Sequence, residues 1–190
     1  MRYILIIGKT SSGKDTIAKY LKHKFGINPL VSYTTRPMRD GEIDGVEHYF
    51  ISKEEMKEMV DNEFESMIAY TQFPKTGYEY CALDPDPEGI KDGCLSYIIN
   101  PEGIDWMQLN YKGNNKFFSV YVDCDEDTIR RRALNRGDGV KAIEDRLDSE
   151  REQFDKYKKS GKYNFLFDNN GEKYGESMER LLAAIKEFFQ

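Results

Sequence analysis

Apolar and polar residues follow two patterns along the chain. Short apolar runs, which are typical of buried strands, predict strands at 3–7, 94–99, 116–122 and 163–167. Helical spacing, capping residues or long charged runs predict helices at 17–25, 53–62, 126–135, 140–159 and 177–189. Because these strands and helices alternate, we expect an α/β fold: a parallel sheet with helices on both faces, in a three-layer arrangement.

Two helix starts carry capping signals. Ser52 precedes the helix at 53–62, and Glu55 completes a capping box with it. Asp125 is placed to cap the helix at 126–135. The residues 136–139, Arg-Gly-Asp-Gly, predict a flexible break before the next helix.

The segment 31–91 departs from the alternation. Residues 30–50 are charged and alternate poorly, and turns and loops are expected over 71–93 because of its glycines and prolines: Pro74, Gly77, Pro85, Pro87, Gly89 and Gly93. We therefore expect a core at 1–30 and 92–190 with an insertion at about 31–91 that lies over a functional cleft.

Length and composition narrow the class of protein. A chain of 190 residues with 39% hydrophobic residues suits one domain with a small inserted lobe. The net charge of −6 argues against nucleic acid or an anionic membrane as the main partner. Three widely separated cysteines without CxxC spacing, no apolar run of membrane length and no signal peptide predict a cytoplasmic protein. The sequence leaves a homodimer open.

A glycine-rich turn follows the first strand. Gly8 and Gly13 stand at the spacing G-x-x-x-x-G-K, which lets successive backbone N–H groups surround phosphate oxygens, and Lys14 adds a positive charge. The pattern predicts nucleoside triphosphate binding, although a similar turn can merely join a strand to a helix. The predicted ATP-binding residues are Gly8, Lys9, Thr10, Ser11, Ser12, Gly13, Lys14, Asp15 and Thr16.

Asp15 stands where the motif normally has the Ser or Thr that ligates magnesium, and Thr16 follows it. A carboxylate is a hard oxygen ligand and can hold Mg²⁺ directly or through water. The alternative is that Asp15 only caps the helix and favours its dipole.

A second stretch, residues 32–45, also has anion-binding chemistry. Arg36 and Arg39 can converge on one anion, and hydroxyl groups stand nearby at Ser32, Thr34 and Thr35. Alone, this would be a solvated turn. Beside a phosphate loop, it suggests transfer of phosphate between two substrates.

The stretch resembles the acceptor loop of guanylate kinases. Residues 32–50 match the pattern S-x-T-T-R-x-x-R-x-G-E-x-x-G-x-x-Y-x-F at nearly every position. Gly77-Tyr78-Glu79-Tyr80 is similar to the family's G-N-Y-Y segment. Residues 131–147 resemble its arginine-rich lid and the following helix, and residues 163–170 resemble its last strand and the V-N-D-D that follows. The resemblance implies a phosphate-loop fold with a small mixed acceptor-binding insertion and a lid at about 131–146.

The resemblance also implies roles for single residues. Ser32, Arg36, Arg39 and Tyr80 match residues that hold the acceptor, mostly by its phosphate. Lys14, Arg132, Arg136 and Arg146 match cations that neutralise the transferring group. By helical spacing alone, the last three arginines would be only part of a charged helix face.

Several positions depart from the family pattern. His48 replaces a phosphate-binding Tyr, although Tyr49 is adjacent and a one-residue slip would supply it. Ala82 and Asn100 replace a hydroxyl and an Asp that read guanine, and Ile98 replaces another acid near the phosphates. Glu65 or Ser66 stands for the base-reading Glu, and Asp168 replaces an Asn near the donor adenine.

We therefore expect a nucleoside monophosphate kinase that uses ATP with Mg²⁺, with GMP or dGMP as the leading acceptor. The altered base-reading positions leave another deoxynucleotide or a phosphorylated sugar as an alternative acceptor. A non-catalytic guanylate-kinase-like protein-binding module is the alternative of a different class, but such modules usually lack the lysine found here at Lys14.

Overall fold

A computed structural model describes residues 1–73, 76–86, 88, 90, 93–171 and 174–190. The chain forms two compact units. The parallel-sheet unit contains Met1–Pro29, Lys91–Pro101 and Asn115–Gln190, and the mixed-sheet unit contains Leu30–Ile90 and Glu102–Asn114.

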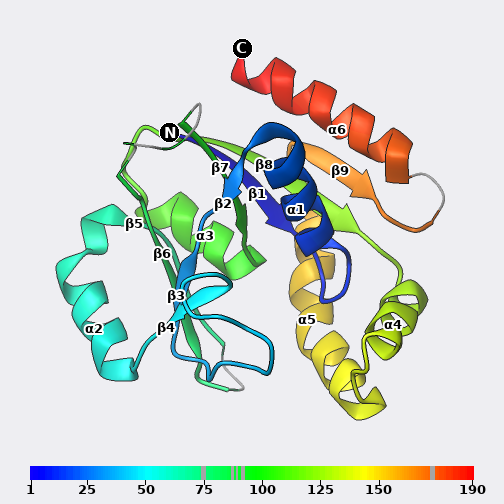
Figure 1. Ribbon diagram of the computed structural model, residues 1–190, viewed down its shortest axis with the longest axis horizontal. Helices are drawn as coiled ribbons and strands as arrows, with labels where there is room; N and C mark the ends of the chain where they lie inside the picture. The colour runs from blue at the N-terminus through cyan, green and yellow to red at the C-terminus, as the bar shows by residue number, and fades with distance from the viewer. Residues whose placement is uncertain (74–75, 87, 89, 91–92, 172–173) are drawn as a thin grey trace. The chain divides into compact units, whose positions relative to one another are not determined.

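The parallel-sheet unit is built on five strands (Figure 1). Their order is β2 (Asn28–Pro29), β7 (Cys94–Ile98), β1 (Arg2–Ile7), β8 (Lys116–Asp123) and β9 (Phe165–Asp168). Each neighbouring pair is parallel. The central strand β1 is buried along nearly its whole length, which explains its continuous apolar run.

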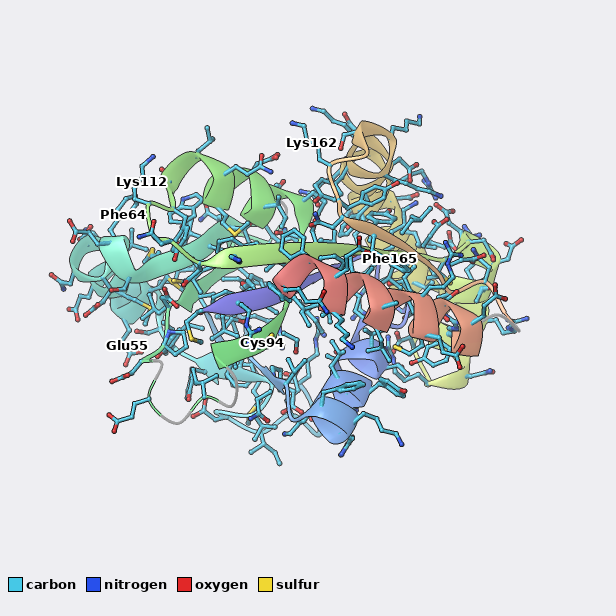
Figure 2. The ribbon with its side chains drawn as sticks, turned by 90° about the horizontal axis from the view of Figure 1, so that it is seen from above. Glu55, Phe64, Cys94, Lys112, Lys162 and Phe165 are labelled. Carbon is cyan, nitrogen blue, oxygen red and sulfur yellow. The ribbon has the colours of Figure 1, made fainter. Side chains whose placement is uncertain are left out.

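Among its described residues, this unit contains the helices α1 (Lys14–Phe25), α4 (Glu126–Asn135), α5 (Val140–Ser160) and α6 (Tyr174–Phe189). Ile4 and Ile6 of β1 share one core with Leu21 of α1 and Leu181 of α6. Phe165 of β9 packs against the same core, and Figure 2 shows it beside α6.

The helix α5 packs against the sheet through different residues. The Tyr121 ring of β8 stacks on Tyr157 of α5 at 6.1 Å, and the Tyr121 hydroxyl donates to the Phe154 carbonyl at 3.3 Å. Tyr121 lies between Val120 and Val122, which belong to the core of α1 and α6, so it points to the opposite face. The predicted parallel sheet with helices on both faces is confirmed.

The strand register brings three loops to one edge of the sheet. Ile7 of β1 is paired with Tyr121 of β8, and Asp123 with Asp168 of β9. The segments beginning at Gly8, Cys124 and Asn169 therefore leave neighbouring strands at their carboxyl ends. In open α/β sheets this edge is where ligands bind.

The mixed-sheet unit contains a four-stranded sheet in the order β4 (His48–Phe50), β3 (Ser32–Thr34), β6 (Glu79–Leu83) and β5 (Met67–Gln72). β3 pairs in parallel with β4, whereas β6 is antiparallel to both β3 and β5. The unit also holds α2 (Lys53–Asn62), the 3₁₀ turn η1 (Phe64–Ser66) and α3 (Pro101–Asn110) from Glu102 onward. Its core is formed by Met56, Met67 and Cys81.

Most predicted elements are present, some with shifted ends. The capping box of α2 and the Asp125 cap of α4 are confirmed, and the three cysteines are free and buried. The last helix begins earlier than expected, at Tyr174, and the last strand begins later, at Phe165. None of the helices in the described ranges is long and apolar enough to cross a membrane.

The strands β2 to β6 and the helix α3 were not predicted from the sequence. The prediction of loops over 71–93 was wrong for Glu79–Leu83, which forms β6, and for the end of β5. β6 gains its order from pairing with strands on both sides, and no local pattern reports such pairing. Of the residues behind that prediction, Pro74, Pro87 and Gly89 lie outside the described residues.

Phe167 tests the core between the sheet and α6, because its side chain is fully buried. We expect Phe167→Ala to lower the free energy of unfolding by about 3 to 5 kcal/mol. The neighbouring Leu166 is 43% exposed, so Leu166→Ala should cost only about 0.5 kcal/mol. Urea unfolding measures both, and equal losses would contradict this core assignment.

Candidate functional site

The turn after β1 has a backbone that requires glycine at two positions. A Cβ atom on Gly8 would lie 2.7 Å from the Ser12 hydroxyl and 2.8 Å from the Val122 carbonyl oxygen. Gly13 has φ +103°, and a Cβ there would lie 2.3 Å from the Asn169 side-chain nitrogen. Side chains are therefore excluded where the chain turns most tightly.

The first turn of α1 is open to an anion. Its N-cap is Gly13, which makes no side-chain capping hydrogen bond, so the helix dipole and its first N–H groups are available to phosphate. Asp15 and Thr16 are exposed in this turn. Asp15 does not occupy the cap position, and both side chains offer oxygen donors of the kind that Mg²⁺ prefers.

Lys14 is held inside the phosphate loop, Gly8–Asp15. Its ammonium donates to the Lys9 carbonyl at 2.7 Å. Burial lowers the pKa of Lys14, while the nearby Glu150 and Asp15 carboxylates oppose that shift. A partly desolvated cation interacts strongly with phosphate because water screens it less.

Two side chains fix the loop through a single carbonyl group. The Asn169 side-chain amide donates to the Ser12 carbonyl at 2.7 Å, and Arg132 donates to the same oxygen at 3.2 Å. Arg132 also donates to the Asn169 carbonyl at 2.9 Å. The predicted lid residue Arg132 thus ties α4 to the loop.

The other two predicted lid arginines converge on one acid. Arg136 donates to the Ser11 hydroxyl at 3.2 Å and pairs with Asp138. Arg146 of α5 lies 3.5 Å from the same Asp138 carboxylate. Arg132 and Arg136 therefore contact the phosphate loop directly. Arg146 is linked to it through Asp138, which also pairs with Arg136.

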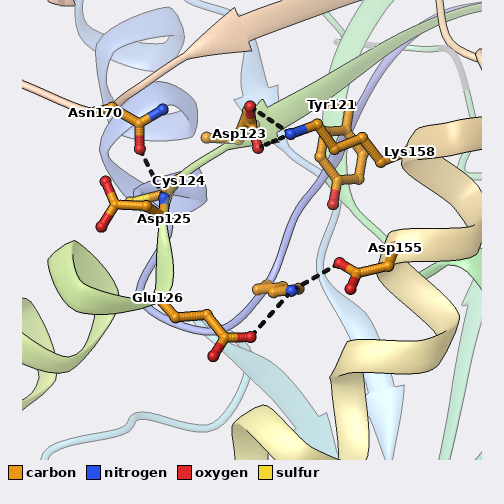
Figure 3. A pocket seen from close by; sticks show the side chains of 10 residues that line it. Tyr121, Asp123, Cys124, Asp125, Glu126, Asp155, Lys158 and Asn170 are labelled. Atoms are coloured by element: carbon orange, nitrogen blue, oxygen red, sulfur yellow. Dashed lines mark hydrogen bonds and ion pairs between the residues drawn. The ribbon is translucent and has the colours of Figure 1, made fainter.

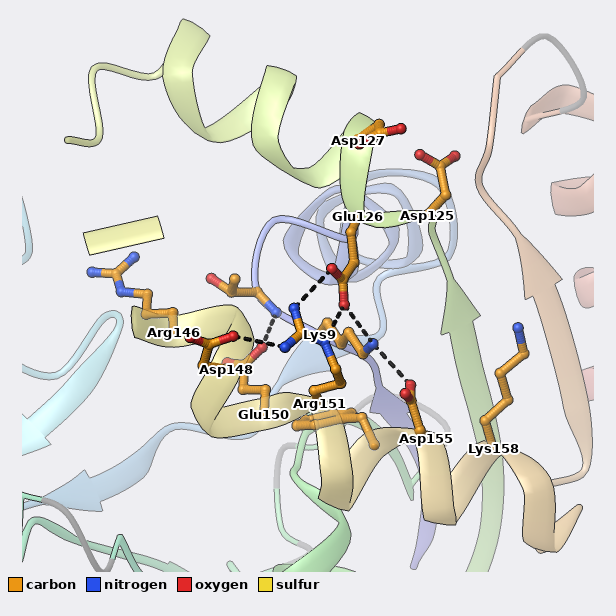
Figure 4. A network of polar contacts seen from close by, with 12 residues as sticks. Lys9, Asp125, Glu126, Asp127, Arg146, Asp148, Glu150, Arg151, Asp155 and Lys158 are labelled. Atoms are coloured by element: carbon orange, nitrogen blue, oxygen red, sulfur yellow. Dashed lines mark hydrogen bonds and ion pairs between the residues drawn. The ribbon is translucent and has the colours of Figure 1, made fainter. Parts of the chain in front are cut away.

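A charged network joins the loop to α4 and α5 (Figure 4). The Lys9 ammonium lies 3.4 Å from Glu126 and 2.8 Å from Asp155. Arg151 binds Glu126 with two hydrogen bonds of 3.0 Å. The hydrogen bonds from Arg151, with the charge of Lys9, lower the pKa of the Glu126 carboxyl to about 2. The Lys9 ammonium is therefore paired with two carboxylates, one from α4 and one from α5.

A carboxylate also lies on the phosphate loop itself. Glu150 of α5 accepts a hydrogen bond from the Thr10 backbone N–H at 2.7 Å. Burial raises the pKa of Glu150, while this hydrogen bond and the charge of Lys14 oppose the rise.

A cavity of about 230 Å³ lies between the start of α4 and α5 (Figure 3). Its charged walls are largely paired: Lys158 lies 2.7 Å from Asp123, and Lys9 is paired as described above. The side chain of Asn170, which also lines the cavity, accepts from the Asp125 N–H at 2.6 Å. These pairs hold the end of β8 against α5.

The mixed-sheet unit contains the second predicted site. Arg36 forms a two-pronged ion pair with Glu42, each hydrogen bond being 2.9 Å long, and its Nε donates to the Tyr80 hydroxyl at 3.3 Å. Glu42 also accepts from the Arg39 N–H at 2.7 Å. The hydrogen bonds from Arg36 lower the pKa of Glu42 to about 2. The Arg39 side chain is exposed.

His48 and Tyr49 point to opposite faces of β4, because neighbouring residues alternate in a strand. The His48 Nδ1 lies 2.9 Å from the Ser32 hydroxyl, and its ring meets Tyr80 edge-on. Tyr49 instead stacks on Tyr33 at 4.8 Å. Burial and the positive charge of Arg36 lower the pKa of His48, so a neutral imidazole faces the site.

Two predicted hydroxyl groups bond to the backbone. Thr34 donates to the Glu79 carbonyl at 3.0 Å and accepts from the Arg36 N–H at 3.1 Å, while Thr35 accepts from the Glu79 N–H at 2.9 Å. These bonds join the end of β3 to β6, and the bond from the Arg36 N–H fixes the backbone at Arg36.

The predicted base-reading positions lie on different elements. Glu65 is exposed in η1. It lies at the end of the β5–β6 hairpin where the Asp84 N–H donates to the Ser66 carbonyl, whereas Tyr80 pairs with Thr71 toward the other end. Ala82 is fully buried and pairs with Ala69. Asn100 follows β7 in the parallel-sheet unit and is half-buried. Asp168 accepts from the Asn170 backbone and side chain.

Three site residues were missed: Glu42, Glu150 and Asn169. Glu42 lies in the same acceptor-loop motif as Arg36 and Arg39. Two nearby arginines favour an acidic partner, so their positive charge could have pointed to Glu42. Asn169 belongs to the Asp-Asn-Asn turn after the last strand, where a polar residue at the carboxyl edge of the sheet is a hint. Glu150 lies in a helix full of acids, and no local signal singles it out.

A phosphate loop at the carboxyl edge of a parallel sheet defines a phosphate-loop nucleotide-binding protein. The guanylate kinase family model matches residues 1–189. The chain belongs to the guanylate kinase family, a family of nucleoside monophosphate kinases.

Relatives match over nearly the whole chain. The guanylate kinase of Syntrophus aciditrophicus is 27% identical over 189 residues, which cover 97% of this chain and 86% of that protein. That of Chlorobaculum tepidum is 27% identical over 191 residues, covering 98% and 93%. The crystal structure of guanylate kinase from Anaplasma phagocytophilum has a TM-score of 0.66 at 20% identity, covers 99% of this chain and 87% of its own, and shows the same fold.

Glu126 should stabilise the fold in a pH-dependent way. Its pKa of about 2 lies below the ordinary value of 4.5, so its contribution is present above pH 4.5 and is lost as the pH falls through about 2. We expect Glu126→Gln to lower the free energy of unfolding by about 1 to 3 kcal/mol at neutral pH. The gap from the wild type should narrow as the solution becomes acidic.

Urea unfolding at several pH values measures this gap. Glu179→Gln removes an exposed carboxylate from α6, and its pH dependence should match that of the wild type. A gap for Glu126→Gln that stays constant from neutral pH down to the folded pKa of about 2 would contradict the network.

Proposed function

We propose that the protein transfers the γ-phosphoryl group of ATP to a nucleoside monophosphate, with GMP or dGMP as the leading acceptor. The observation that carries this proposal is the intact phosphate loop with Lys14 inside it, in a chain of the guanylate kinase family. The same observation argues against a non-catalytic protein-binding module. The acceptor identity rests on the acceptor-loop residues 32–50.

The donor site is assigned to the loop Gly8–Asp15 and the first turn of α1. Backbone N–H groups and Lys14 bind the ATP phosphates, and Arg132, Arg136 and Arg146 supply positive charge as the transferring group spreads its charge. Asp15 and Thr16 are the oxygen donors that would hold Mg²⁺, directly or through water. When bound, the ion neutralises the phosphate oxygens.

The acceptor site is assigned to the mixed-sheet unit. Arg36, Arg39, Ser32, Tyr80 and His48 bind the acceptor phosphate, and Glu42 holds Arg36 in one orientation before substrate arrives. Transfer needs the acceptor oxygen in line with the γ-phosphorus, and no covalent enzyme intermediate is required. Cytoplasmic location and one functional domain, 1–190, belong to the same proposal.

The segment 131–146 is proposed as a lid. It contains the break between α4 and α5, where Gly137 has φ +94° and nothing lies within 4 Å of the Cβ position of Gly137 or Gly139. Such open positions can absorb the backbone changes of a hinge. Closure would exclude water and so suppress hydrolysis of ATP.

Lys14→Ala tests the donor site. We expect kcat/KM to fall by about a hundredfold or more, because a charged donor to the transferring phosphate is lost. Coupled measurement of ADP release gives the rate, and thermal unfolding with and without Mg-ATP reports binding. Lys19→Ala removes an exposed lysine of the same helix and should leave both unchanged. Full activity of Lys14→Ala would refute the assignment.

An acceptor panel tests the second site. Buried Ala82 and the amide of Asn100 lack the hydroxyl and acid that the family resemblance leads us to expect, which favours comparing GMP and dGMP with other monophosphates and phosphorylated sugars. In the wild type, GMP or dGMP should give the highest kcat/KM.

Arg39→Ala should raise KM for the acceptor about tenfold or more while changing KM for ATP little. Equal changes in both KM values would count against the acceptor role of Arg39.

A further inference from the structure

The structure shows an anion already bound to the phosphate loop, and that anion is part of the protein. The Glu150 carboxylate accepts a hydrogen bond of 2.7 Å from the Thr10 N–H, although the two residues stand 140 positions apart. Thr10 lies in the middle of the loop, between Gly8 and Gly13. Backbone N–H groups of such a loop are the donors that phosphate oxygens use.

The charges around Glu150 are those that a nucleotide phosphate would meet. Its carboxylate interacts favourably with Lys14, Arg146 and Lys9, and Lys14 and Arg146 are the cations assigned above to the phosphates. Arg146 stands one helical turn before Glu150 on α5, so both project from one side of the helix (Figure 4). One carboxylate thus accepts a hydrogen bond from a loop amide and is stabilised by the positive charges of the donor site.

The position of Glu150 is fixed by its surroundings. On one side, Lys9 of the loop is paired with Asp155 of α5. On the other, Arg151 is bound to Glu126 at the start of α4. These contacts hold the middle of α5 against the loop and keep the carboxylate within reach of Thr10.

We propose that Glu150 is an affinity-determining residue of the donor site: its carboxylate occupies the Thr10 amide in place of a phosphate oxygen and must leave when ATP binds. This inference rests on the proposed function. The Glu150 carboxylate competes with any phosphate chain for the same N–H donor and the same cations. The free energy needed to break the contacts of Glu150 is therefore subtracted from the free energy of triphosphate binding. When Glu150 leaves, Arg146 and Lys14 exchange one anion for another.

This competition predicts that substituting a residue of the donor site raises the affinity for ATP, whereas most substitutions in a binding site lower it. Glu150→Gln keeps the size and a carbonyl acceptor but removes the charge, and Glu150→Ala removes both. We expect both variants to bind Mg-ATP more tightly than the wild type, by about three- to tenfold. The reason is that the wild type must break the hydrogen bond between the Glu150 carboxylate and the Thr10 N–H when ATP binds, whereas neither variant has this charged hydrogen bond to lose. A role in merely shaping the loop predicts weaker binding in Glu150→Ala.

The experiment is calorimetric titration of the full chain with Mg-ATP, inorganic tripolyphosphate and adenosine. Tripolyphosphate should gain as much affinity as ATP in both variants, and adenosine should gain none, because only phosphates compete with Glu150. Glu152→Gln removes an exposed carboxylate two residues away on α5, and its affinities should match those of the wild type. Circular dichroism checks that each variant is folded.

The outcomes separate the two proposals. Tighter binding of ATP and tripolyphosphate in the Glu150 variants, with Glu152→Gln unchanged, supports the inference. Wild-type binding of ATP with no gain in either Glu150 variant, or an equal gain in Glu152→Gln, overturns the inference and leaves the proposed function standing. Failure of the wild type and of both folded Glu150 variants to bind Mg-ATP overturns both.

Discussion

The candidate donor site depends on the two hydrogen bonds that hold the Ser12 carbonyl. Asn169 and Arg132 supply them from the ends of β9 and α4, at 2.7 and 3.2 Å. A loop with Ser11 at φ +51° and Gly13 at φ +103° does not keep its shape by local preference. The parallel register of β1, β8 and β9 is what delivers the clamping residues to the loop. The fold and the phosphate site therefore stand on the same three strands.

Acids organise the cations in both units. Glu42 holds Arg36, Glu126 joins Lys9 to Arg151, and Asp138 gathers Arg136 and Arg146. Each pairing offsets like-charge repulsion and fixes long side chains, whose ordering would otherwise cost entropy when a substrate binds. The sites are therefore preorganised, and their net positive charge is smaller than a count of arginines and lysines implies.

The sequence predicts what is local and misses what pairing decides. The buried runs of β1, β7 and β8, the phosphate loop and the Ser52 capping box carry their own signals, and the structure contains each of them. The strands around Arg36 are short and polar and form only through their neighbours. Likewise Tyr49 is adjacent to His48 in sequence but faces away from it, and Glu150 meets Thr10 only because α5 packs beside the loop.

The strength of the Glu42 ion pair has a consequence for how the acceptor loop responds to its surroundings. Because the pKa of Glu42 is about 2, the carboxylate keeps its charge in mildly acidic solution. The ion pair between Arg36 and Glu42 is therefore kept at that pH. Burial and the positive charge of Arg36 also lower the pKa of the neighbouring His48, so its imidazole takes up a proton at a lower pH than a free one does. Both groups therefore hold their neutral-pH charge further into acid than free side chains would, which makes the electrostatics of the acceptor loop less sensitive to acidification.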